Sequence, residues 1–227
     1  MADITDIDYF DHWEATQHEF NEIFNRNPSL LGMIKGYMAE EKLKTMYLEN
    51  NDKVQNLFSP DDHDRELKGD WRFDWEGAED QHIVIEVKCL QSNYVKSREK
   101  SNGETVYSGK YQCDASDRRE IDLEHGETVS TTLLEVGEFD ILAVGIFEFG
   151  EKWDFVFAKN DDLPRTSYHK YTERARDRLI KGMHSLEYPL DDGSIYSEDI
   201  FALVKETVEE GETVAMDSGS DGPVVNS

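Results

Sequence analysis

Alternation of apolar and polar residues is clearest between residues 69 and 89. The chain there reads Gly-Asp-Trp-Arg-Phe-Asp-Trp-Glu-Gly and, after a short polar stretch, His-Ile-Val-Ile-Glu-Val-Lys-Cys. Because side chains at i and i+2 of a strand share a face, the pattern predicts a hairpin of strands 70–76 and 82–89 joined across residues 77–80. Further strands are predicted at residues 53–58, 110–114, 119–123, 128–135, 139–149 and 153–158.

Helical periodicity predicts four helices, at residues 6–26, 30–49, 168–184 and 196–208. Asn27-Pro28-Ser29 separates the first, which is acidic and amphipathic, from the second. The polar stretch 92–110 shows no such pattern and is predicted to be a mobile loop. The order of helices, strands and helices predicts an α/β (α+β) fold with a central mixed sheet flanked by helices.

Charge is distributed unevenly along the chain. The net charge is −26, of which residues 1–27 carry −6 (seven acids, one arginine) and residues 206–227 carry −6 (six acids, no base), so −14 remains between them. Residues 165–181 are locally basic, with six cations against two acids. We therefore expect an acidic N-terminal helix over residues 1–30, a main domain over 31–208 and a disordered acidic tail over 209–227.

Composition limits the protein's setting. No apolar run approaches the roughly 18 residues of a membrane span, and the N-terminus lacks the basic and apolar regions of a secretory signal. The two cysteines, Cys89 and Cys113, do not make a disulfide framework or a four-ligand zinc site. We expect a cytoplasmic protein with no membrane partner.

Acidic and basic side chains converge at one end of the predicted hairpin. Glu86 and Lys88 share a strand face, and counting across the turn sets Glu86 opposite residues 71–72 and Lys88 opposite residues 69–70. Asp70 then lies beside both, whereas the alternative acid, Asp74, faces residues 83–84. Two carboxylates suit Mg²⁺, and Lys88 would position or deprotonate the attacking water, or stabilise charge in the transition state.

This arrangement, an aspartate followed by Glu-x-Lys in the apolar strand Ile83–Lys88, resembles the PD-(D/E)xK nuclease superfamily, which includes many type II restriction endonucleases, junction resolvases and repair nucleases. Gly69 stands where the motif has its nominal proline. Residues 36–40, Gly-Tyr-Met-Ala-Glu, match the helical glutamate of such enzymes, with Glu41 as the competing candidate for Glu40. The motifs cover residues 36–88, and the strands predicted after residue 139 resemble the family's later core strands more loosely.

The resemblance implies a restriction-endonuclease-like core and a Mg²⁺-dependent endodeoxyribonuclease, with Mn²⁺ as the alternative ion. Asp70 and Glu86 would be the metal ligands, and Glu40, Asp70, Glu86 and Lys88 the catalytic residues. DNA would be cut to leave a 5′-phosphate, and cleavage of both strands favours a homodimer. The rival interpretations are a Holliday-junction or repair nuclease, and a non-catalytic acidic binding protein on the same fold, which the net charge favours.

Two basic segments are further candidates for DNA contact. Arg118 and Arg119 are able to grip phosphate, although local ion pairs explain them better. Arg174, Arg176 and Arg178 would follow a DNA backbone or simply form a solvated helix face. Asp140, at the start of an apolar strand, is expected to cap that strand.

Overall fold

The computed structural model describes residues 7–60, 67–78, 81–123 and 126–211. The chain separates into two compact units, residues 1–38 and 39–227, and each is described by itself. Among the described residues, no helix combines the length and the apolar character needed to cross a membrane. Of the acidic tail expected over residues 209–227, Glu209 and Glu210 belong to a helix, and the part after Gly211 lies outside the described residues.

The first unit contains α1 (Tyr9–His12), α2 (Gln17–Arg26) and the beginning of α3 (Pro28–Leu43). The single helix expected over residues 6–26 is therefore interrupted. Glu14 has a positive φ of 50°, and Thr16 starts α2 with a capping box in which its side chain and that of Glu19 satisfy each other's backbone amides. The predicted break before α3 is present, with Pro28 at the helix start, where its missing amide costs nothing.

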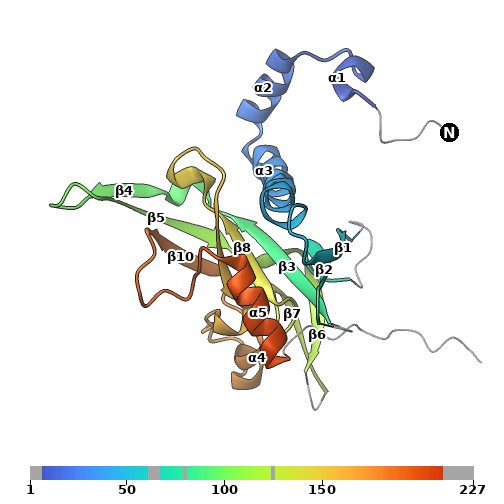
Figure 1. Cartoon of the computed structure of the whole chain (residues 1–227), viewed down its shortest axis with the longest axis vertical. Coiled ribbons are helices and arrows are strands. Elements are labelled where there is room, and N and C mark those ends of the chain that lie inside the picture. Colours follow the sequence, from blue (N-terminus) through green and yellow to red (C-terminus); the bar gives the residue numbers. More distant parts are fainter. Residues whose placement is uncertain (1–6, 61–66, 79–80, 124–125, 212–227) are drawn as a thin grey trace, which may run out of the picture. The chain divides into compact units, whose positions relative to one another are not determined.

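A mixed five-stranded sheet forms the centre of the second unit (Figure 1). Its strands, in order across the sheet, are β1 (Val54–Phe58), β2 (Trp71–Trp75), β3 (His82–Cys89), β8 (Ile141–Gly145) and β9 (Phe155–Lys159). β3 and β8 are parallel, and the other neighbours are antiparallel. The predicted fold class, a mixed sheet flanked by helices, is confirmed, and both predicted apolar hairpins are present.

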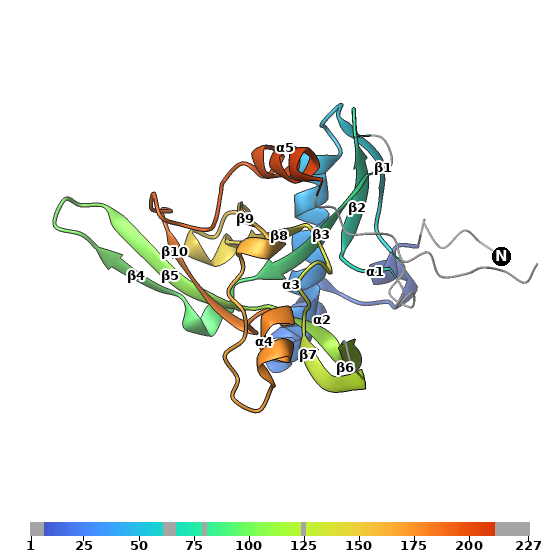
Figure 2. The same ribbon diagram turned by 90° about the horizontal axis from the view of Figure 1, so that it is seen from below.

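The two faces of β3 belong to different parts of the core. Ile83, Ile85 and Val87 pack with apolar residues of α3 and of α5 (Ile200–Glu210), whereas Val84 on the other face packs with residues of a second sheet. Figure 2 shows α5 on one side of β8 and β9, with β5 and β10 on the other. The unbroken apolar run Ile83-Val84-Ile85 follows from this burial on both faces.

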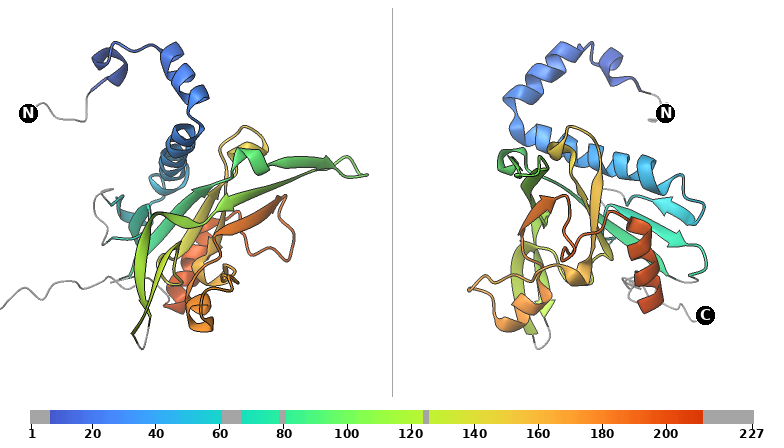
Figure 3. Two further views of the ribbon diagram at one scale, coloured as in Figure 1. Left: turned by 180° about the vertical axis from the view of Figure 1, so that it is seen from behind. Right: turned by 60° about the vertical axis from the view of Figure 1, so that its left-hand side comes forward.

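Two smaller sheets correct the sequence prediction (Figure 3). One has the order β10-β5-β4, with β4 (Lys96–Glu99), β5 (Thr105–Gln112) and β10 (Met183–Tyr188), and the other pairs β6 (Asp114–Leu123) with β7 (Glu127–Leu133). The loop predicted over residues 92–110 is therefore wrong, since most of it is a β-hairpin. The helix predicted over residues 168–184 is also wrong: α4 covers only Glu173–Arg178, and β10 follows because it pairs along β5.

Within the part of the chain that the structure describes, the other named helical turns are short. They are a π-helical turn at Lys44–Leu48, which continues α3, and 3-10 turns at Ser92–Tyr94, Phe147–Phe149 and Asn160–Asp162.

Candidate active site

Asp70 lies directly against β3. Trp71 pairs with Ile85 in an antiparallel register, so Asp70, the residue before Trp71, lies opposite Glu86, the residue after Ile85. The Asp70 amide donates to the Ile85 carbonyl at 2.8 Å, and the Val87 amide donates to Oδ2 of Asp70 at 2.6 Å. The register expected from the sequence, with Glu86 opposite residues 71–72, differs by one or two residues, and the observed register sets Asp70 opposite Glu86 instead of Lys88.

Glu86 and Lys88 form an ion pair on one face of β3. The Lys88 Nζ lies 2.6 Å from Oε1 of Glu86, and the two side chains are only 20% and 12% exposed. Alternation along the strand directs both away from Ile85 and Val87, which pack toward the helices. The structure thus brings Asp70, Glu86 and Lys88 together in one largely buried cluster.

The cluster contains two carboxyl groups, Asp70 and Glu86, and one amine, Lys88. Burial raises the pKa of Asp70 well above its usual value, and the charges of Glu86 and Glu40 raise it further, against the opposing effects of Lys88 and the Val87 amide. Burial by itself would lower the pKa of Lys88, but the neighbouring charges of Glu86 and Asp70 raise it above the ordinary lysine value. Lys88 is therefore an ammonium ion at neutral pH.

The two helical glutamates occupy different surroundings. The Glu40 carbonyl accepts a hydrogen bond from the indole of Trp71 at 3.0 Å, and the Glu40 charge contributes to the raised pKa of Asp70. Glu40 therefore lies within electrostatic reach of the cluster. Glu41 is exposed and forms an ion pair with Lys44 at 3.6 Å.

Asp74 is not part of this cluster. It lies four residues further along β2, about 13 Å away at strand spacing, and pairs with His82. Asp140, expected to cap a strand, accepts a hydrogen bond from the Val84 amide at 2.7 Å.

The sequence did not predict that Arg119, Glu138 and Cys113 would come together beside the cluster. Arg119 on β6 binds both carboxylate oxygens of Glu138, and the charge of Glu86 is among the effects that raise the Arg119 pKa against the lowering effect of burial. Burial raises the pKa of Cys113 to about 12, although the charge of Lys88 opposes that rise. The ion pair of Arg119 is therefore not the local one that the sequence favoured, because Glu138 lies 19 residues further along the chain, and Arg118 is exposed.

Gly69 fits a position that no other residue fits easily. Its φ is +78°, and an added Cβ would lie 2.4 Å from Cγ1 of Val84 and 3.0 Å from the Ile85 carbonyl oxygen. Proline is held near φ −65°, so the nominal proline of the motif could not adopt this bend. The glycine lets the backbone approach β3 closely just before Asp70.

The donor set suits a hard divalent cation bound through two carboxylates. Asp70 and Glu86 provide oxygen ligands, and a bound cation would oppose the rise in the Asp70 pKa that burial and the charge of Glu86 cause. Within the described part of the chain, no three histidine, cysteine, aspartate or glutamate side chains are arranged to hold a metal together. Mg²⁺ commonly uses only one or two carboxylates and completes its shell with water and substrate phosphate.

Comparison of the chain with protein-family models, with curated proteins and with solved structures found no match.

Proposed function

We propose that this protein is a Mg²⁺-dependent endodeoxyribonuclease of the PD-(D/E)xK type with a restriction-endonuclease-like core. The observation that carries the proposal is the largely buried cluster in which Asp70, just before β2, meets Glu86 and Lys88 of β3. Burial and the charge of Glu86 raise the pKa of Asp70, and a bound cation would favour its charged form. Such an arrangement is readily explained by catalysis and poorly by stability.

Asp70 and Glu86 would hold the metal, with Mn²⁺ able to use the same ligands. When bound, Mg²⁺ would lower the pKa of a coordinated water and neutralise charge on the scissile phosphate. Lys88 keeps its proton, so it would orient the water and stabilise the negative charge that develops on the phosphate, and it would not act as the general base. Glu40, within electrostatic reach of Asp70, would help to orient the hydrated site.

In the proposed reaction the water oxygen bonds to phosphorus while the bond from phosphorus to the 3′-oxygen breaks. The attacking water loses its proton to solvent, a solvent water protonates the departing 3′-oxygen, and the products carry a 5′-phosphate and a 3′-hydroxyl. Restriction-like cleavage of both strands requires two such sites, which a homodimer would supply. A cytoplasmic setting agrees with a chain that has only two cysteines, both free.

The test is cleavage of supercoiled plasmid, linear DNA and a four-way junction by the purified protein, with and without Mg²⁺. Asp70→Ala and Lys88→Ala should abolish the Mg²⁺-dependent cleavage, while Asp74→Ala, which removes the same group about 13 Å along β2, should retain it. Discrete fragments from linear DNA favour a restriction enzyme, and selective junction cleavage favours a resolvase. The absence of Mg²⁺-dependent cleavage on methylated and unmethylated DNA would refute the enzyme and leave a non-catalytic binding protein.

A further inference from the structure

The hairpin of β4 and β5 projects from the second unit as an arm (Figures 1 and 3). All four residues of β4 are exposed, and β10 pairs with β5 on the side away from β4. β5 ends at Gln112, and Leu90, two residues after Lys88, forms a β-bridge with Tyr111 close to that end, while the Gln91 amide donates to the Lys110 carbonyl at 2.8 Å. The arm is therefore rooted next to the candidate active site.

The strand register decides which side chains share a face of the arm. Residues directly opposite each other on neighbouring strands share a face, as do residues two apart on one strand. Lys96 pairs with Ser108, Arg98 with Val106 and, on the other side of β5, Lys110 with Ser185. Lys96, Arg98 and Lys110 consequently lie on one face, which we call the basic arm face.

A contact across the sheet agrees with this assignment. Glu187 of β10 pairs with Ser108, so it belongs to the same face, and Arg98 Nη2 lies 3.8 Å from Oε2 of Glu187 across the intervening strand. The Lys110 Nζ lies 5.3 Å from the ring centre of Tyr94.

The charge of this face is opposite to that of the whole chain. It carries three cations and one acid, Glu187, while the other face of the same three described strands carries Glu99 and no lysine or arginine. The complete chain has a net charge of −26. A local positive surface on such a protein attracts a polyanion specifically, because the rest of the molecule repels it.

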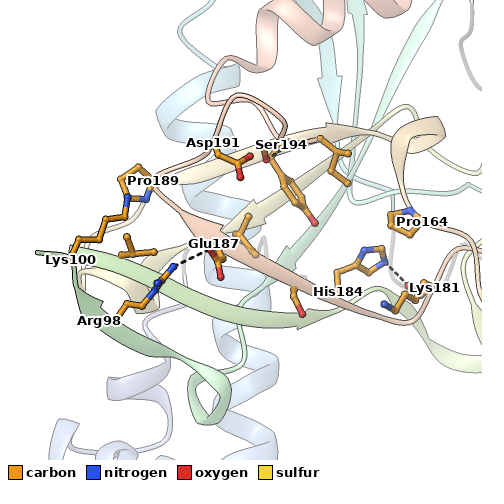
Figure 4. Close-up of a pocket in the computed structure, with 14 residues that line it drawn as sticks. Arg98, Lys100, Pro164, Lys181, His184, Glu187, Pro189, Asp191 and Ser194 are labelled. Carbon is orange, nitrogen blue, oxygen red and sulfur yellow. Dashed lines mark hydrogen bonds and ion pairs between the residues drawn. The ribbon is translucent and has the colours of Figure 1, made fainter. Parts of the chain in front are cut away.

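A cavity of about 600 Å³ borders β10, and its lining combines Arg98 and Glu187 of the basic arm face with residues of the opposite face, His184 and Leu186. Figure 4 shows Arg98 and Lys100 at one end of it and Lys181 at the other, with Glu187 and Asp191 as its acids. Lys100 also pairs with Glu104 at 3.1 Å.

We propose that the basic arm face binds the sugar-phosphate backbone of duplex DNA and holds the substrate beside the active site. This inference rests on the proposed nuclease function, for which it names the docking surface. Lys96 and Arg98 are about 7 Å apart at strand spacing and lie on the same face, so both are able to contact phosphates of one DNA strand. Such contacts position DNA without reading its sequence.

The experiment measures binding of a fluorescent duplex oligonucleotide by anisotropy, without divalent cations, over a range of salt concentrations. The variant Lys96→Ala/Arg98→Ala/Lys110→Ala is compared with the matched control Arg26→Ala/Lys152→Ala/Lys205→Ala, which removes the same charges from exposed sites elsewhere. We expect the arm variant to bind about tenfold or more weakly and its log–log salt dependence to be shallower by about 3. The control should match the wild type. Lys96→Glu alone should weaken binding in the same direction if the triple variant folds poorly.

Unchanged affinity and salt dependence in the arm variant, or an equal loss in the control, would overturn the inference. Plasmid cleavage measured in parallel separates it from the proposed function. If the wild type cleaves DNA but the arm variant binds DNA as tightly as the wild type does, only the docking surface is refuted. Arm-dependent binding without cleavage refutes the nuclease alone, and the absence of both binding and cleavage refutes both.

Discussion

Val87 donates its backbone amide to Oδ2 of Asp70 at 2.6 Å, although the two residues belong to different segments of the hairpin. This bond, with the one from the Asp70 amide to the Ile85 carbonyl, fixes the aspartate against β3 where Glu86 begins the Glu-x-Lys pattern. A carboxylate held there is close to a second acid and largely removed from water. Its position is therefore costly to the fold and suited to binding a cation.

Asp70→Asn should abolish cleavage and, at neutral pH, stabilise the metal-free protein. Because the folded state raises the pKa of Asp70 above 3.8, the stability linked to this group is full below that value and is lost as pH rises through the folded pKa. Asparagine removes this loss and keeps an acceptor for the Val87 amide. Thermal melts should show a gain on the order of 1 kcal/mol or more at neutral pH, vanishing toward pH 3.8. A variant less stable than the wild type at neutral pH would contradict the electrostatic account.

Lys88→Met should destabilise the metal-free protein by about 3 kcal/mol, because the cluster loses the cation that offsets its two carboxylates. Mg²⁺ should raise the melting temperature of the variant more than that of the wild type, since the unbalanced acids bind the ion more tightly. Ca²⁺ and Na⁺ at matched ionic strength serve as controls. Equal shifts for both proteins would show that the ion binds elsewhere.

Glu40→Gln should reduce cleavage markedly, whereas Glu41→Gln should remain close to the wild type. The charge of Glu40 contributes to the raised pKa of Asp70, whereas Glu41 is exposed and forms an ion pair with Lys44. The Glu40 variant should also lower the pKa of Asp70, which carboxyl NMR titration would detect. If Glu41→Gln proved the more damaging substitution, the assignment of the helical acid would have to be reversed.

Local patterns predicted the elements that build the candidate site. The i, i+2 spacing of Glu86 and Lys88 and the apolar run around them were sufficient for β3, and the paired apolar segments indicated β8 and β9. The exact register was not predictable from length alone, because the positive-φ bends at Gly69 and Gly77 alter how the hairpin closes.

Elements that depend on distant partners were missed. β4 is exposed along its whole length, so its sequence has no apolar face, and β10 was not predicted as a strand, its first two residues falling inside the helix predicted over residues 168–184. Tertiary pairing overrides weak local preference in such segments. The contact of Arg119 with Glu138 joins β6 to the segment before β8, and no spacing rule links two residues so placed.

Asp140→Ala should destabilise the protein by about 2–4 kcal/mol without a specific effect on cleavage by the folded molecules. The carboxylate accepts from the Val84 amide at 2.7 Å, and the Asp140 amide donates back to the Val84 carbonyl at 2.9 Å, so the pair fastens β8 to β3. Its charge also opposes the lowering of the Arg72 pKa by burial. Asp140→Asn keeps an acceptor and should cost less. Chemical denaturation measures both, and an undiminished stability of the alanine variant would exclude this structural role.

Gly69→Ala should destabilise the fold and reduce cleavage together. A left-handed backbone costs a non-glycine residue about 1–2 kcal/mol, and the new methyl group would meet Cγ1 of Val84 at 2.4 Å. Relief of that contact would move the chain away from β3 and with it the carboxylate of Asp70. Adding Val84→Ala should recover part of the cleavage rate, because it removes the nearest atom, but not the backbone strain. Gly77→Ala, with φ +86° and open space around it, is the matched control for strain alone and should leave cleavage unchanged. Equal loss of cleavage in the two alanine variants would show that the close approach at Gly69 does not position Asp70.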